Sequence, residues 1–96
     1  MPAVRSKADS TMQINNGAVL VTKWKFAPGD ETGWHKHEHD YIVVPLTGGA
    51  LTLETKDGLI SADLLPGRSY ARQKGVEHNV INGNDFDISF VEIELL

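Results

Sequence analysis

The stretch GDETGWHKHEHDYIVVPLTG, residues 29–48, places a cluster of histidines directly before a short apolar segment. Three of the four histidines in the chain lie here, at His35, His37 and His39. On an extended segment, alternate side chains leave the same face with backbone positions about 6.6 Å apart. Two imidazoles can then converge on one metal ion, to which histidine nitrogen binds at about 2.1 Å. The same spacing also fits a solvated loop, so a metal site needs a further ligand from elsewhere in the chain.

The remaining histidine, His78, lies in residues 78–81, a short run that suits a β-strand. On a strand its side chain can face the interior, where it would meet His35 and His37. Three neutral imidazoles with an open coordination position suit Fe, Zn, Mn, Ni or Cu, and the sequence does not choose among them. We therefore expect one divalent transition metal to be bound by His35, His37 and His78, with His39 as a candidate fourth ligand.

The rest of the chain alternates between short β-forming segments and turn residues. The predicted strands are residues 19–26, 41–46, 51–54, 59–62, 69–72, 78–81 and 86–95. Asp57-Gly58 lies between two alternating segments, which is typical of a β-hairpin. We expect Glu92 and Glu94 to point outward from the last strand. Apolar residues do not recur at helical spacing over any long segment. Closely spaced short strands predict an all-β fold, either a barrel or a double-sheet jelly roll.

The length and charge of the chain limit the classes of protein to which it can belong. A chain of 96 residues has room for one domain, which we place at residues 14–96, after a polar, flexible N-terminal arm at residues 1–13. The 13 acidic and 9 basic residues give a formal charge of −4, which argues against nucleic acid or an anionic membrane as partner. No segment is apolar enough to span a membrane and none resembles an export signal, so we expect a cytoplasmic protein. The absence of cysteine excludes disulfides and thiol catalysis.

Two spaced motifs in the chain resemble those of the cupin superfamily. The first family motif runs Gly, five residues, His-x-His, three or four residues, Glu, six residues, Gly; the second runs Gly, five residues, Pro-x-Gly, two residues, His, three residues, Asn. Eight of these ten positions are matched, by Gly29, His35, His37, Gly48, Gly67, Gly75, His78 and Asn82. Tyr41 stands in place of the glutamate and Gln73 in place of the proline. On this fixed spacing the chain is identified as a member of the superfamily.

The resemblance implies a cupin fold, a double-stranded β-helix or jelly-roll barrel with the metal inside the barrel mouth. This agrees with the pattern of short strands. Residues 33–46 and 75–82 are also similar to small single-domain bacterial cupins, some of which are associated with β-alanine degradation.

Tyr41 is the main departure from the family pattern, because in many metal-binding cupins the motif glutamate is the fourth protein ligand. A neutral phenol is a poor ligand for most divalent ions. We therefore expect three histidines and water around the metal, unless His39, Asp40 or Glu38 supplies the missing ligand. His39 is also a candidate acid or base, since an imidazole takes both protonation forms near neutral pH. Tyr41 is a candidate hydrogen-bond donor to a metal-bound species, or a plain lining aromatic.

These residues favour a metal-dependent enzyme of the oxygenase, isomerase or decarboxylase type that acts on a small organic acid in the barrel. His39 and Tyr41 are then the candidate catalytic residues. A non-catalytic module that binds a small ligand or a metal is the alternative, because a fold alone does not fix function. Arg72 is a candidate partner for a substrate carboxylate, although surface solvation also explains it. The arm and residues 19–26 can cover the edge of a neighbouring barrel, so we expect a homodimer.

Overall fold

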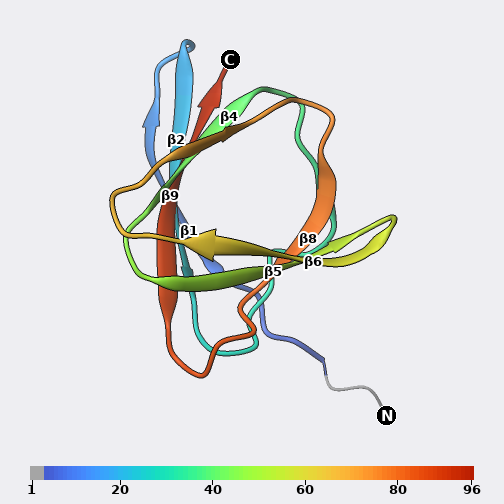
Figure 1. Cartoon of the computed structure of the whole chain (residues 1–96). Helices are drawn as coiled ribbons and strands as arrows, with labels where there is room; N and C mark the ends of the chain where they lie inside the picture. The colour runs from blue at the N-terminus through green and yellow to red at the C-terminus, as the bar shows by residue number, and fades with distance from the viewer. Residues whose placement is uncertain (1–3) are drawn as a thin grey trace.

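The computed structural model describes residues 4–96, and these residues form nine β-strands and no helix. The strands are β1 (Asp9–Asn15), β2 (Val19–Phe26), β3 (His35–Lys36), β4 (Tyr41–Pro45), β5 (Gly49–Thr55), β6 (Gly58–Leu64), β7 (Tyr70–Arg72), β8 (Glu77–Ile81) and β9 (Ile88–Leu95). Figure 1 shows them curving around a common centre. The all-β prediction is confirmed. Because residues 4–96 contain no helix, none of them forms a helix that could cross a membrane.

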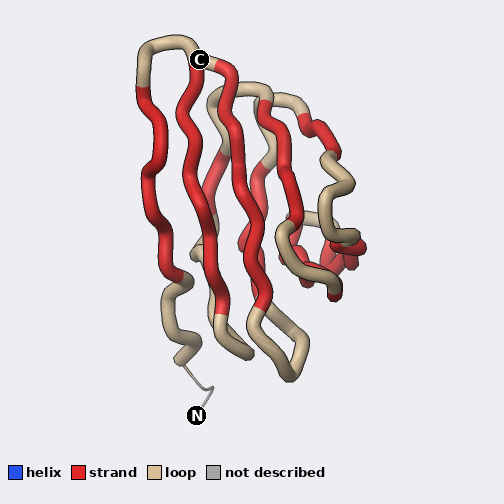
Figure 2. Tube along the Cα trace, turned by 90° about the vertical axis from the view of Figure 1, so that its left-hand side faces the viewer, coloured by secondary structure: helices blue, strands red, loops and turns tan. Residues whose placement is uncertain are grey.

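The strands form two antiparallel sheets. The larger sheet has the order β1-β2-β9-β4-β7 and the smaller sheet the order β3-β8-β5-β6. Strands far apart in the chain are neighbours, and β2 and β9 pair along their whole length, from Val19↔Leu95 to Phe26↔Ile88. Figure 2 shows β1, β2 and β9 side by side in the larger sheet. Two sheets joined by such crossing connections make the predicted jelly-roll barrel.

The predicted hairpin is also confirmed. Strands β5 and β6 pair from Gly49↔Leu64 to Thr55↔Gly58, so Lys56 and Asp57 form the turn between them. Gly58 has a φ of 109°, a backbone conformation that glycine adopts without the steric cost of a side chain.

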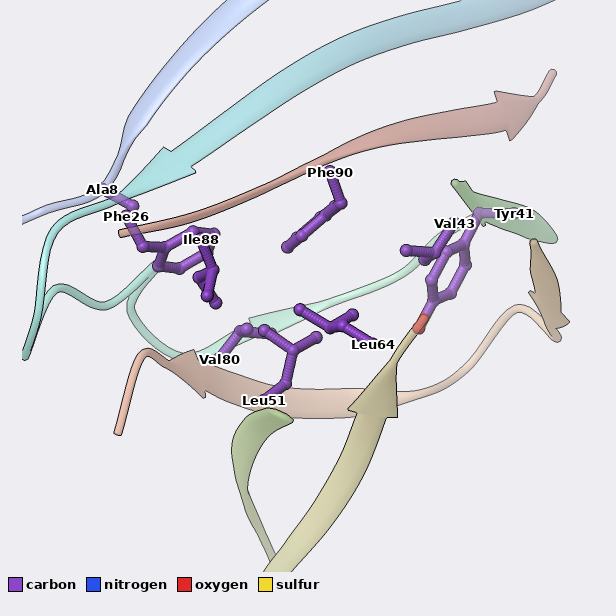
Figure 3. Close-up of a cluster of buried hydrophobic side chains, with 9 residues drawn as sticks. All are labelled: Ala8, Phe26, Tyr41, Val43, Leu51, Leu64, Val80, Ile88 and Phe90. Carbon is purple, nitrogen blue, oxygen red and sulfur yellow. The ribbon is translucent and has the colours of Figure 1, made fainter. Parts of the chain in front are cut away.

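Apolar side chains from both sheets fill the space between them, as Figure 3 shows. This core contains Ala8, Phe26, Tyr41, Val43, Leu51, Leu64, Val80, Ile88 and Phe90. Phe26 and Ile88 are completely buried, and the rings of Phe26 and Phe90 lie 5.6 Å apart. Each large apolar side chain removed from water in this way contributes about 1.5–3 kcal/mol to folding. The two sheets are therefore held face to face by packing along their inner surfaces.

Asn82 ties the loops next to the two histidine segments together. Its side-chain amide donates to the backbone oxygens of Phe26 at 3.2 Å and Phe86 at 2.9 Å, and its side-chain oxygen accepts a bond from the Asn84 nitrogen at 2.9 Å. The backbone oxygen of Asn82 accepts a further bond from the Gly29 nitrogen at 2.8 Å. The segment before β3 is thereby held against the end of β8. This gives the motif asparagine a structural role.

The N-terminal segment differs from the prediction of a flexible arm. Residues 9–15 form β1, which pairs with β2 from Asp9↔Lys25 to Asn15↔Leu20, so residues 9–13 belong to the larger sheet. Every residue of β1 is exposed, and a strand without a buried face carries no apolar alternation by which to detect it. Residues 1–3 of the expected arm lie outside the described residues.

Candidate metal centre

The pairing of β3 with β8 brings the two histidine segments together. In this register His35 lies directly opposite His78. His37 follows β3, and its backbone nitrogen donates to the Val76 oxygen at 2.9 Å, just before β8 begins. Side chains that lie opposite each other in a pair leave the same face of the sheet. The backbone of two short segments therefore places three imidazoles at one point on the inner surface.

The Nε2 atoms of His35, His37 and His78 form a triangle with sides of 3.1 Å. The rings meet edge to face, with centroids 4.8, 4.7 and 5.1 Å apart. The structure thus brings together the three histidines selected from the sequence as metal ligands. Metal binding depends on whether these nitrogens carry lone pairs or protons.

The protonation of His35 is set by a neighbouring carbonyl group. Its Nδ1 atom lies 2.8 Å from the backbone oxygen of Gly33. Because a carbonyl oxygen only accepts, Nδ1 carries the hydrogen and donates it, and in the neutral ring Nε2 is left with a lone pair. This lone pair points toward His37 and His78, which is the orientation that a metal ligand requires.

Burial keeps the rings of His37 and His78 neutral. It lowers the pKa of His37 from 6.5 to about 4, with repulsion from His35 and His78 adding to the effect. It lowers the pKa of His78 from 6.5 to about 4 too, again with a contribution from His35. At neutral pH both imidazoles are therefore uncharged. Neutral imidazole is the form that binds transition metals.

The spacing of the three nitrogens fits a single metal ion. With metal–nitrogen distances of about 2.1 Å, nitrogens 3.1 Å apart subtend angles of about 95° at the ion. Octahedral coordination would separate neighbouring nitrogens by about 3.0 Å and tetrahedral coordination by about 3.4 Å. The three histidines would therefore hold a single ion between them, and an ion that takes more than three ligands would also bind water or substrate.

Tyr41 occupies the position of the motif glutamate and packs against the cluster instead of joining it. Its ring stacks on the His37 ring with centroids 3.8 Å apart and planes tilted by 15°. The side chain is 3% exposed, and burial, with a contribution from Glu92, raises the pKa of the phenol. Tyr41 therefore stays protonated at neutral pH. It orients His37 by stacking and keeps a hydroxyl group that can donate a hydrogen bond.

The other candidate ligands lie outside the triangle. Among the described residues, the compact histidine group does not include His39. His39 lines a second hollow, which His35 and His37 also border. The role of His39 as ligand or proton carrier stays a prediction. Asp40 accepts a hydrogen bond from the Lys74 backbone nitrogen at 2.8 Å and so has a structural task.

The prediction that Glu92 and Glu94 point outward is wrong. The Glu92 side chain is 13% exposed and its carboxylate lies 3.7 Å from Nδ1 of His37. Together with His37 and Glu94 it forms a second compact group of potential ligands. Burial, assisted by the neighbouring Glu94, raises the pKa of Glu92 from 4.5 to about 8. Alternation along β9 could have revealed this, because buried Ile88 and Phe90 share their face with residues 92 and 94.

A cavity of about 210 Å³ adjoins the histidine cluster. Its polar lining residues are His37, His78, Tyr41, Tyr70, Arg72, Glu92 and Thr55. Its apolar lining residues are Val43, Leu51, Leu53, Ile60, Ala62, Val76, Val80 and Phe90. A small molecule in this space would contact two of the three histidine rings that form the triangle.

Comparison with known proteins decides the family. No protein-family model matches the chain. A protein of Pseudomonas aeruginosa, beta-alanine degradation protein BauB, is 54% identical over 91 residues, which cover 95% of this chain and 96% of that protein. A crystal structure of a cupin domain from Bordetella pertussis Tohama I is 53% identical to this chain and covers 99% of both chains with a TM-score of 0.96. The chain belongs to the cupin family.

More distant cupins share the fold. A cupin superfamily protein from Desulfitobacterium hafniense DCB-2 is 18% identical, and the match covers 100% of this cupin and 84% of that protein, with a TM-score of 0.73.

The comparison with the Pseudomonas protein confirms the resemblance to small cupins linked to β-alanine degradation, which the sequence showed in residues 33–46 and 75–82.

Proposed function

We propose that this cupin is a metal-dependent enzyme that binds one divalent transition metal through His35, His37 and His78 and acts on a small organic acid. The observation that carries the proposal is the triangle of Nε2 atoms with sides of 3.1 Å. If all three Nε2 atoms carry lone pairs, they repel one another at this distance, and a cation between them would remove that repulsion. No disulfide or thiol chemistry competes for the role, because the chain has no cysteine.

The bound metal would polarise a carbonyl group or bind dioxygen, as the oxygenase, isomerase and decarboxylase types require. The protein contributes the surroundings. The carbonyl of Gly33 fixes the orientation of His35, and the stacked ring of Tyr41 fixes that of His37. The Tyr41 hydroxyl group is the candidate hydrogen-bond donor to a substrate oxygen, and His39 at the outer side of the cluster is the candidate proton carrier.

The substrate class rests on two observations. The cavity beside the histidines holds about 210 Å³, which is smaller than the roughly 300–1,000 Å³ of sites for drug-sized ligands. The Pseudomonas relative is named for β-alanine degradation and is 54% identical over nearly the whole chain. A short-chain carboxylic acid of the kind met in the breakdown of β-alanine fits both.

The proposal is tested by metal analysis of protein purified without an affinity tag, followed by turnover assays. We expect about one transition-metal ion per chain. Oxygen uptake and product formation from a panel of short carboxylic acids should then identify the reaction. His35→Ala should lose both metal and turnover, whereas His39→Ala should keep the metal. Unsubstituted protein without bound metal, or turnover that survives in His35→Ala, contradicts the proposal.

The presence of Tyr41 in place of a glutamate ligand favours a second candidate, a non-catalytic module that binds a metal and a small ligand. The same assays separate the two. A full complement of metal, together with acid binding and no turnover across the panel, supports the binding module in place of the enzyme.

A further inference from the structure

We propose that Arg72 is the specificity-determining residue of the cavity and binds the carboxylate of a short-chain monocarboxylic acid. This inference rests on the proposed function, because it names the group by which the site would recognise its acid. Arg72 lies on β7, at the edge of the larger sheet, and lines the same cavity as His37 and His78.

The strand register places Arg72 close to the histidine cluster. Arg72 on β7 lies directly opposite Tyr41 on β4, and the Tyr41 ring stacks on His37. Neighbouring strands are about 4.8 Å apart. Arg72 is therefore one strand spacing from Tyr41, whose ring touches a histidine of the triangle. An acid of a few carbon atoms can contact the guanidinium group with its carboxylate while its other end faces the histidines.

Two contacts hold the guanidinium group in place. Its central carbon lies 4.5 Å from the centre of the Tyr70 ring, and Nη1 donates to the Ala71 backbone oxygen at 2.9 Å. A guanidinium group has five N–H donors in a planar fork, so one backbone bond leaves donors for a bidentate contact with a carboxylate. Stacking on the Tyr70 ring restricts the guanidinium group in the unbound protein, which reduces the conformational entropy lost when a ligand binds.

The distribution of charge in the cavity favours an anion at this position. Of the described residues that line it, Arg72 is the only lysine or arginine. The acidic lining residue, Glu92, lies on β9, and the sheet order β9-β4-β7 puts its backbone two strands from that of Arg72, or about 10 Å across the sheet. A carboxylate bound at Arg72 would therefore meet a positive charge carried by a different strand from the acidic residue.

The rest of the cavity selects for a short aliphatic chain. The wall contributed by β5 and β6 is apolar apart from Thr55 on β5, and its apolar residues are Leu51, Leu53, Ile60 and Ala62. The volume of about 210 Å³ corresponds to about seven water molecules at roughly 30 Å³ each. One cationic contact at the rim and an apolar wall of this size suit a monocarboxylate better than a dicarboxylate or a sugar.

The test compares an acid with its uncharged analogue. Protein loaded with Zn(II), which brings no redox chemistry, is titrated with propanoate and with propanamide, and binding is measured by calorimetry. We expect propanoate to bind more tightly. Arg72→Met should weaken propanoate binding by about ten- to a hundredfold, as expected for a lost charged hydrogen bond, and leave propanamide binding unchanged. The affinity of Arg72→Lys for propanoate should lie between those of the unsubstituted protein and Arg72→Met. Arg68→Met removes an equal charge from an exposed arginine outside the cavity lining and should have no effect.

The outcomes separate this inference from the proposed function. Metal retention in each variant is checked by the absorption spectrum of the Co(II) form, which Arg72→Met should leave unchanged. An unchanged preference for propanoate in Arg72→Met, or no preference in the unsubstituted protein, overturns the role of Arg72 while the metal centre stands. If the protein binds no metal, the proposed function fails, and the same pair of titrations on metal-free protein still decides whether Arg72 selects the acid.

Discussion

His35 and His78 lie directly opposite each other in the β3–β8 pair, with 3.1 Å between their Nε2 atoms. The geometry of the candidate metal centre is therefore set by strand register. A shift of one residue in β3 would turn His35 to the opposite face of the sheet. The backbone bond from His37 to Val76 and the contacts of Asn82 hold this register although β3 has only two residues.

Removal of one histidine should abolish tight metal binding. We expect His78→Ala to weaken Co(II) or Zn(II) binding by more than about a hundredfold, because even loss of a partner behind a ligand costs 10–100-fold in affinity. Calorimetric titration of metal-free protein measures the effect. His39→Ala is the matched control, since His39 lies outside the compact group. Equal affinities for the two variants would refute the assignment of His78.

The stability of the metal-free protein should fall in mild acid. Burial lowers the pKa of His37 and His78 from 6.5 to about 4. Between these values the unfolded chain binds more protons than the folded chain, so the free energy of unfolding decreases as the pH falls from about 6.5 to about 4. Thermal unfolding followed by circular dichroism across this range should show a falling midpoint. The unfolding midpoint of the double variant His37→Gln/His78→Gln should depend less steeply on pH than that of His39→Gln. An equal pH dependence in both variants would contradict burial of His37 and His78 as the cause.

Glu92 should produce the opposite trend at higher pH. Burial raises its pKa from 4.5 to about 8, so in this interval the folded chain binds more protons than the unfolded chain. Stability contributed by the neutral carboxyl group is present below pH 4.5 and is lost as the pH rises through about 8. In metal-free protein, Glu92→Gln should remove the fall in stability between pH 4.5 and 8, as measured by thermal unfolding. Glu38→Gln, at an exposed position, should show the same fall in stability as the unsubstituted protein. If Glu92→Gln still shows the fall, the buried carboxyl group is not its cause.

The exposed edge of the larger sheet predicts self-association. β1 pairs only with β2 in the described part of the chain, and Met12 and Ile14 on it are 64% and 46% exposed. An uncovered strand edge of this kind is a template for pairing with a second chain. Light scattering should give the mass of a homodimer, and Met12→Lys/Ile14→Lys should shift the mass toward the monomer. A monomeric mass for the unsubstituted protein at working concentration rules the homodimer out.

Most strands could be predicted because their signals are local. The alternation in residues 19–26 and the Asp57-Gly58 turn each depend on near neighbours, and both predictions match the structure. β1 was missed because it has no buried face. β3 was missed because two residues carry too little pattern.

In the candidate site, too, residues identified by their spacing in the sequence could be predicted, whereas a residue whose neighbours are distant in the chain could not. The spacing of His35 and His37 and the lone His78 selected the three histidines from the sequence. Glu92 was misplaced because charged residues are seldom buried without a partner, and its neighbour, His37, lies far from it in the chain. Only the fold brings β9 beside the histidine segment.

X-ray absorption spectroscopy of metal-loaded protein, purified without a tag, tests the central claim most directly. The account predicts three imidazole nitrogens at about 2.1 Å from a single ion, with outer-shell scattering from three rings, and two rings in His78→Ala. A spectrum of the unsubstituted protein with fewer than three imidazoles around the metal would contradict it.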